Sequence, residues 1–198
     1  MRRLVLVRHS LPQIVPGLPA SQWVLSEEGR CRCRLLAEAL AAFQPDVVVS
    51  SHEAKAVETG RLIAAELDKP FETADGLHEH ERSNVPYCDR ERFEAAVAEF
   101  FARPDELVFG DETAQQALGR FSQAIHATVS RHLPRHARRR HTRRQTIAVV
   151  THGTVMTLFV AHIAGVEPFS FWQGLGLPAF VVLALPEFEL LNVTNSIA

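Results

Sequence analysis

Two histidines in this chain follow short apolar runs and have neighbours suited to phosphate chemistry. Arg8 and His9 come directly after the apolar run 4–7, and His152 comes directly after segment 146–151. A neutral imidazole is a good nucleophile, and an arginine offers a planar fork of donors that matches phosphate oxygens. Phosphoryl transfer needs little besides positioning, neutralisation of charge and a proton for the leaving oxygen. The pattern therefore predicts a phosphoryl-transfer site, provided that the two histidines meet.

The two histidines meet if their apolar runs form neighbouring parallel strands. Ligands in open α/β sheets bind outside the carboxyl ends of the strands. Short apolar segments alternate with helical patterns along most of the chain, which predicts an α/β, three-layer α/β/α sandwich with a mostly parallel six-stranded sheet and helices on both faces. The expected strands are 4–7, 46–51, 70–73, 146–151, 179–184 and 187–193, and the expected helices are 26–44, 53–67, 89–102, 113–133 and 154–163.

The first expected helix has a clear start and end. Ser26 can cap it, and the acids that follow suit its first turn. Gln44-Pro45 can end it. Its apolar stripe is expected to run through Leu35, Leu36, Leu40 and Phe43.

The composition is that of an ordinary globular protein. The chain has 198 residues, of which 46% are hydrophobic and 22% charged, with a net charge of -2. We expect a single domain over 1–198 and no attraction to nucleic acid or to an anionic membrane. Three cysteines (Cys31, Cys33 and Cys88) form no disulfide framework or metal-ligand pattern, which favours the cytoplasm. No apolar run suggests a signal peptide or a membrane span.

Six segments, in this order, resemble motifs of the histidine phosphatase superfamily, the phosphoglycerate-mutase-like proteins. The first is LVRHS, which resembles the R-H-G signature with Ser10 in the glycine position. Each motif alone is weakly specific, whereas the ordered set over residues 4 to about 165 is specific. The other five are LSEEGRCRCRLLAEAL (resembling L-T-x-x-G-x-x-Q-A), SSHEAKAVETGRLIA (S-x-L-x-R-A-x-x-T-A), Leu77-His78-Glu79 (L-x-E), Gly110-Asp111-Glu112-Thr113 (G-E-S/T) and VVTHGTVMTLFVAHIAG (the second-histidine motif).

The resemblance implies roles for five residues. His9 would attack phosphorus and become phosphohistidine, while Arg8 and His152 would hold the phosphoryl oxygens. Glu79 would give the proton to the leaving group and then act as base for water. Lys55 stands where the family usually has an arginine. The family needs no metal, and we expect no metal and no other cofactor here.

Departures from the family pattern leave some assignments open. Lys55 keeps the charge but lacks the bidentate fork of arginine. Glu81 is a rival to Glu79 as the acid, because the sequence after Glu79 departs from the family pattern. Ser10 and His52 follow strand ends and are further candidates for substrate binding.

The leading functional hypothesis is a phosphatase that hydrolyses phosphomonoesters of a small metabolite. A phosphoglycerate-mutase-type phosphotransferase, a protein phosphohistidine phosphatase and a non-catalytic phospho-ligand-binding module are the alternatives. We interpret the Arg- and His-rich segment 131–144 as a surface connection. Two more specific hypotheses are that it forms an electrostatic funnel for an anionic substrate or that it contacts nucleic acid. The oligomeric state stays open, with a homodimer as one option.

Overall fold

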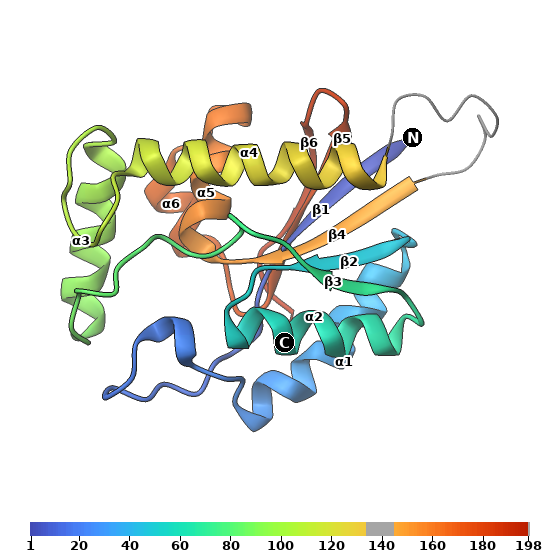
Figure 1. The fold of residues 1–198 in the computed structure, drawn as a ribbon, viewed down its shortest axis with the longest axis horizontal. Helices are drawn as coiled ribbons and strands as arrows, with labels where there is room; N and C mark the ends of the chain where they lie inside the picture. Colours follow the sequence, from blue (N-terminus) through green and yellow to red (C-terminus); the bar gives the residue numbers. More distant parts are fainter. Residues whose placement is uncertain (134–144, 198) are drawn as a thin grey trace.

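The computed structural model describes residues 1–133 and 145–197 (Figure 1), so most of the Arg- and His-rich segment lies outside the described residues. The described chain forms an α/β fold of six strands with helices on both sides, which confirms the expected fold class. The elements are β1 (Arg2–Arg8), a 3-10 helix η1 (Ala20–Gln22), α1 (Glu27–Ala41), β2 (Val47–Ser50), α2 (Ala54–Glu66), β3 (Phe71–Thr73), α3 (Arg90–Ala102), α4 (Ala114–His132), β4 (Gln145–Thr151), α5 (Gly153–Ala164), α6 (Pro168–Gly174), β5 (Ala179–Leu185) and β6 (Glu189–Thr194).

The sheet order is β3-β2-β4-β1-β5-β6, and the first four strands in this order run parallel. β5 joins β1 in antiparallel fashion, and β6 pairs with β5 in the same way. β1 and β4 are neighbours, with Arg8 opposite Thr151 in the register. The His9 backbone N–H donates to the Thr151 carbonyl at 3.0 Å, which carries the pairing one step beyond the strand. The residues that follow β1 and β4 are therefore side by side.

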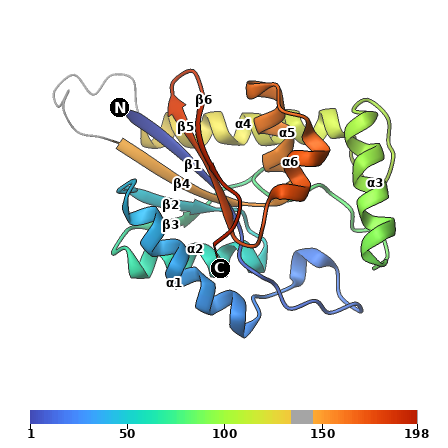
Figure 2. The ribbon, with the colours of Figure 1, turned by 180° about the vertical axis from the view of Figure 1, so that it is seen from behind.

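Helices cover both faces of the sheet (Figures 1 and 2). One apolar core joins α1 and α2 to alternate residues of β1 such as Val5 and Val7. The other core joins α4, α5 and α6 to the intervening residues Leu4 and Leu6. A strand buried on both faces has to be apolar at every position, which explains the unbroken run at 4–7. Within the described residues, no helix combines the length and apolarity needed to cross a membrane.

The helix α1 begins and ends close to the expected residues. The Ser26 hydroxyl accepts a hydrogen bond from the Gly29 backbone N–H at 3.0 Å and so caps the first turn. The expectation that Leu35 belongs to the apolar stripe is wrong, because Leu35 is 41% exposed while Cys33, Leu36 and Leu40 are buried. Those three positions follow the helical spacing of three to four residues, and Leu35 falls between them. The short helix α6 was not expected from the sequence.

Candidate active site

His9 and His152 lie together at the carboxyl end of the sheet. His9 follows β1, and His152 is the N-cap residue of α5. Their ring centroids are 5.2 Å apart, and both side chains are buried. Burial lowers the pKa of His9 well below its ordinary value, and the charges of His152 and Lys55 lower it further. Burial also lowers the pKa of His152, to about 4, so both rings are neutral near pH 7.

The hydrogen bond of His9 fixes its tautomer. The Nδ1 atom of His9 lies 2.8 Å from the carbonyl oxygen of Ser10. A carbonyl can only accept, so Nδ1 holds the ring hydrogen and Nε2 has the lone pair. His152 contacts the Ser51 hydroxyl through its own Nε2 at 2.7 Å. Among the described residues, the buried Nδ1 of His152 has no hydrogen-bond partner.

Arg8 crosses the N-terminal end of α5 because residue 153 is a glycine. A Cβ atom on Gly153 would lie 2.9 Å from Nε of Arg8 and 3.0 Å from its guanidinium carbon. The Arg8 Nη1 donates to the Leu175 carbonyl, whereas its buried Nε has no partner in the part of the chain that the structure describes. Burial lowers the pKa of Arg8 to about 10, so the guanidinium keeps its charge at neutral pH.

The Glu79 carboxylate also lies at the start of α5. It accepts hydrogen bonds from the backbone N–H groups of Thr154 and Val155 at 3.2 Å each, and from that of His80 at 2.9 Å. Burial alone would raise the pKa of Glu79, but the charges of Arg82 and His152 outweigh it and lower the pKa to about 2. Glu79 is therefore ionised in the free protein.

A partly buried arginine, Arg120, fixes the backbone around Glu79. Arg120 of α4 donates to the carbonyl oxygens of Gly76, His78 and Glu79 at 2.9 to 3.1 Å. Its charge is paired with Glu112 at 2.5 Å. The carboxylate of Glu112 also accepts from the backbone N–H of Glu81, so two motifs distant in sequence are joined here.

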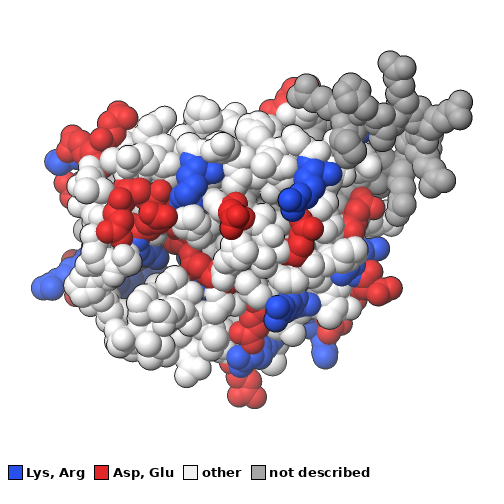
Figure 3. All heavy atoms as spheres, in the orientation of Figure 1, with Lys and Arg blue, Asp and Glu red and all other residues white. Residues whose placement is uncertain are grey.

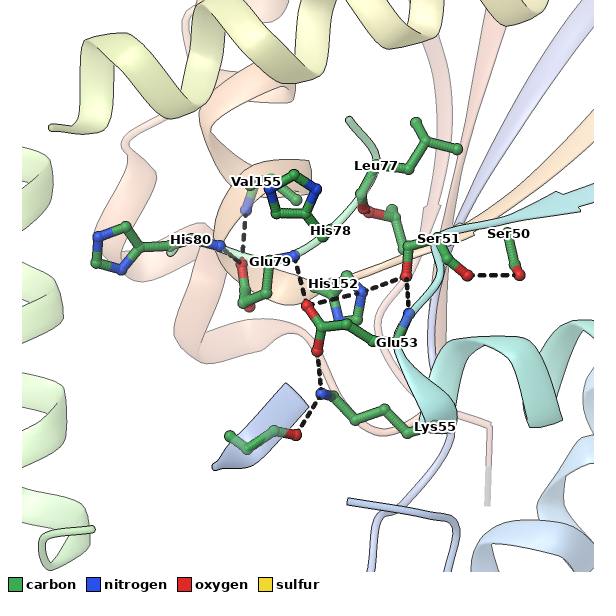
Figure 4. A network of polar contacts seen from close by, with 12 residues as sticks. Ser50, Ser51, Glu53, Lys55, Leu77, His78, Glu79, His80, His152 and Val155 are labelled. Carbon is green, nitrogen blue, oxygen red and sulfur yellow. Dashed lines mark hydrogen bonds and ion pairs between the residues drawn. The ribbon is translucent and has the colours of Figure 1, made fainter. Parts of the chain in front are cut away.

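A second buried carboxylate, Glu53, links the two halves of the site (Figure 4). One of its oxygens accepts from the Glu79 backbone N–H at 2.8 Å and lies 3.6 Å from Nε2 of His152. The other oxygen forms an ion pair with Lys55, which also donates to the Ala20 carbonyl at 2.7 Å. Burial would raise the pKa of Glu53, yet His152 and Lys55 hold it well below its usual range.

Several of these groups stand at one end of a cavity of about 570 Å³, whereas His152 and Glu53 lie behind its lining residues. Arg8, His9, Lys55 and Glu79 all line it, together with Arg82, which sequence reasoning missed. Nη1 of Arg82 is buried and has no hydrogen-bond partner among the described residues. Figure 3 shows the surface hollowed between α3 and the segment 11–23, with blue atoms visible in the hollow. Arg82 comes from the irregular stretch before α3, where no periodic pattern indicated its direction.

Two expected substrate-binding residues do not reach the cavity. The Ser10 hydroxyl donates to the Gly29 carbonyl at 2.7 Å, so it ties the first loop to α1 instead of facing the cavity. The His52 side chain is 57% exposed and pairs with Asp75 at 3.0 Å. The reason is local, because Ser51 turns toward His152 and the next side chain points the other way. Neither side chain is among the described residues that line the cavity.

The two candidate acids, Glu79 and Glu81, differ in their position relative to the cavity. Glu79 lines the cavity. The Glu81 carboxylate is 51% exposed and pairs with His78 at 3.0 Å, away from the two histidines.

Comparison with known proteins agrees with this geometry. The sequence model of the histidine phosphatase superfamily (branch 1) matches residues 4–184. The chain belongs to the histidine phosphatase superfamily. A search of curated protein sequences finds no match.

Solved structures of similar fold include proteins titled phosphatases and hydrolases. A structure titled mycobacterial hydrolase 2 is 19% identical, with a TM-score of 0.77 over 100% of this chain and 91% of that chain. A mycobacterial glucosyl-3-phosphoglycerate phosphatase is 20% identical, with a TM-score of 0.73 over 100% of both chains. A phosphoserine phosphatase mutant from Entamoeba histolytica, in complex with phosphoserine, is 17% identical, with a TM-score of 0.75 over 100% of this chain and 98% of that chain. At these identities the likeness shows the shared fold.

In this member of the superfamily, two glycines of the matched motifs are required sterically. A Cβ on Gly29 would lie 2.1 Å from the Leu11 carbonyl oxygen, so α1 can approach the loop after β1 only without a side chain there. Gly153 makes room for Arg8 in the same way. Both glycines therefore set the position of the segment that holds His9.

Proposed function

We propose that this chain is a phosphatase that hydrolyses phosphomonoesters of a small molecule through a phosphohistidine on His9. The observation that supports this most directly is the orientation of His9, whose Nε2 has a free lone pair at the charged end of the cavity. Its lowered pKa keeps the ring neutral and nucleophilic near pH 7. His9 would attack phosphorus as the alcohol leaves, and water would then release phosphate from His9.

Three buried nitrogen atoms near the two histidines are suited to hold the phosphoryl oxygens. They are Nε of Arg8, Nδ1 of His152 and Nη1 of Arg82, each without a hydrogen-bond partner among the described residues. A buried donor without a partner costs about 1–3 kcal/mol, so an anion that accepts from it recovers that free energy. Lys55 also lines the cavity, but its charge is already paired with the Glu53 carboxylate. We therefore propose that Arg8, Arg82 and His152 provide most of the hydrogen bonds to the phosphoryl oxygens.

Glu79 is the proposed proton donor, although its low pKa means that it must first receive a proton. A phosphate monoester has a second pKa of about 6, so the monoanion brings one proton into the site. Bound next to Glu79, the phosphoryl charge opposes the field of Arg82, which lowers the pKa of this carboxyl group. The proton then passes to Glu79 and from Glu79 to the leaving oxygen. Afterwards the carboxylate acts as base for water.

The similar structures favour hydrolysis of a phosphate ester over phosphoryl transfer of the phosphoglycerate-mutase type. The titles of two of them name phosphatases, one for glucosyl-3-phosphoglycerate and one for phosphoserine. We therefore place phosphoglycerate-mutase-type transfer second to hydrolysis for this chain.

The test is hydrolysis of para-nitrophenyl phosphate in the presence of EDTA. We expect activity that survives EDTA, because the proposed chemistry uses side chains alone. His9→Ala should abolish turnover, whereas His162→Ala, an exposed histidine near the end of α5, should leave it unchanged. Acid-labile but base-stable phosphate should appear on the wild-type protein during turnover and be missing from His9→Ala. Substantial hydrolysis by His9→Ala would exclude the nucleophile, and loss of activity in EDTA would exclude the metal-free mechanism.

A further inference from the structure

The walls of the cavity differ in character from its charged end. They are built by the segment 11–23, by residues 85–88 and by residues 172–177. The segment 11–23 contains no charged residue. In Figure 3 the lower-left surface, where Figure 1 places this segment, is correspondingly white. The cavity thus has a charged end around His9 and largely apolar walls beyond it.

Several large apolar side chains at these walls are exposed to water. Ile14 is 55%, Leu18 45% and Tyr87 54% exposed, and all three line the cavity. Scattered exposed apolar residues are ordinary, but a cluster around the mouth of a binding site marks a contact surface. These three side chains would gain most from a ligand that removes them from water.

The wall is held in place by hydrogen bonds that leave its rings free to contact a ligand. The indole N–H of Trp23 donates to the carbonyl oxygens of Val15 and Leu18 at 3.0 and 3.1 Å, which closes the loop on itself. The Trp23 ring also lies 6.4 Å from the ring of Tyr87, across the cavity wall. The apolar surface is therefore already assembled in the free protein.

The polar groups of the outer wall pair with one another. Arg90 and Glu94 form an ion pair at 2.6 Å, and the Gln173 amide donates to Glu94 at 3.3 Å. The guanidinium of Arg82 lies 4.8 Å from the centre of the Phe93 ring, at the boundary between the charged end and the wall. Among the described lining residues, no cation of the outer wall is left for a second anionic group of the substrate.

We infer that the alcohol part of the substrate is apolar, so that this phosphatase acts on phosphate esters of aliphatic or aromatic alcohols in preference to sugar acids; this rests on the proposed function. The volume of the cavity, about 570 Å³, lies within the range of about 300–1,000 Å³ typical of pockets for drug-sized ligands. A three-carbon acid phosphate would leave Ile14, Leu18 and Tyr87 in water. An alkyl or aryl group covers them.

The experiment is a series of n-alkyl phosphates from ethyl to hexyl, with glycerol 3-phosphate and 3-phosphoglycerate as polar references, assayed by release of inorganic phosphate. The leaving alcohols in the series are chemically alike, so differences in kcat/KM report binding of the alkyl chain. We expect kcat/KM to rise about two- to fourfold per methylene group, and hexyl phosphate to exceed both polar references by roughly tenfold or more.

Matched variants locate the effect in the wall. Ile14→Ser should flatten the dependence on chain length, because it removes apolar contact area from the wall. Leu107→Ser changes a side chain that is 62% exposed and does not line the cavity, so it should keep the wild-type dependence. Tyr87→Ser provides a second wall variant, from the opposite segment.

The outcomes separate this inference from the proposed function. A flat or falling dependence on chain length, higher kcat/KM for 3-phosphoglycerate than for hexyl phosphate, or an unchanged slope in both wall variants would overturn the apolar substrate class alone. If no ester is hydrolysed and no phosphohistidine forms, the proposed function falls as well. A rising series that both wall variants flatten supports the inference.

Discussion

The ionisation of Glu79 leads to a specific prediction for the pH dependence of kcat/KM. The pKa of Glu79, about 2, is about five units below pH 7, so protonating Glu79 from water at pH 7 would cost about 7 kcal/mol. At an effective dielectric constant of about 20, a unit charge roughly 4 Å away changes this energy by about 4 kcal/mol. A phosphoryl dianion, with two charges, would thus raise the pKa of Glu79 by about six units. This rise offsets the free-energy cost of protonating Glu79 at pH 7. The proton is available if the substrate arrives as its monoanion.

We therefore expect kcat/KM to follow the monoanion fraction of the substrate. With a second phosphate pKa of about 6, kcat/KM should fall about fiftyfold between pH 6 and pH 8. Protonation of His9 should not cause a decline near pH 6, because burial lowers the pKa of His9 well below its ordinary value. The measurement is phosphate release from an alkyl ester at low substrate concentration and constant ionic strength.

Two glutamine variants complete this test. Glu79→Gln should lower kcat/KM for an alkyl ester about 10²- to 10⁴-fold at pH 5.5 and flatten the fall above pH 6, since no carboxylate then opposes the dianion. Glu81→Gln alters an exposed carboxylate outside the cavity and should keep the wild-type profile. A wild-type kcat/KM that rises between pH 6 and pH 8, or a Glu81→Gln profile like that expected for Glu79→Gln, would refute this account of the acid.

Three further predictions concern Arg8, the glycines and the buried histidines. Gly153→Ala should lower kcat/KM at least tenfold by displacing the Arg8 guanidinium, and wild-type rates would show that Arg8 does not grip the phosphate. Gly119→Ala, at an open and exposed position of α4, should keep the rate and raise the free energy of unfolding by about 0.5–1 kcal/mol in urea titrations. Below pH 6.5 the unfolded chain protonates His9 and His152 while the native protein does not, so stability should fall as pH drops toward 4. Urea titrations at pH 7 and pH 5 should show a loss of up to about 1.4 kcal/mol per pH unit for each histidine, and His152→Asn should make it shallower.

The meeting of the two histidines could be predicted because it depends on strand order alone. Apolar runs mark the buried strands, and neighbouring parallel strands end at the same edge of the sheet. The register that places Arg8 opposite Thr151 then brings His9 and His152 together whatever the loops do. The same reasoning gave the fold class and most of the element positions.

Other parts of the site depend on the directions in which side chains point, and the sequence pattern alone does not specify these directions. Arg82 lies in the irregular segment 74–89, where neither a helical nor a strand period fixes where a side chain points. In the sequence, Glu53 looks like an ordinary residue at a helix start. Its contact with Glu79 forms only when distant segments fold together, and this fold also buries its ion pair with Lys55. His52 shows the converse, since a place beside a strand end did not bring it into the cavity.

The buried pair of Glu53 and Lys55 limits the route by which such a site can change during evolution. In the family motif, positions 53 and 55 correspond to leucine and arginine. Removing one partner of a buried ion pair costs about 3–5 kcal/mol, whereas exchanging both can be nearly neutral. With Glu53 present, loss of the charge at position 55 would leave the carboxylate without its partner, whereas arginine at that position would keep an ion pair. The two positions are therefore expected to change together, so that a glutamate at 53 is accompanied by a cation, lysine or arginine, at 55.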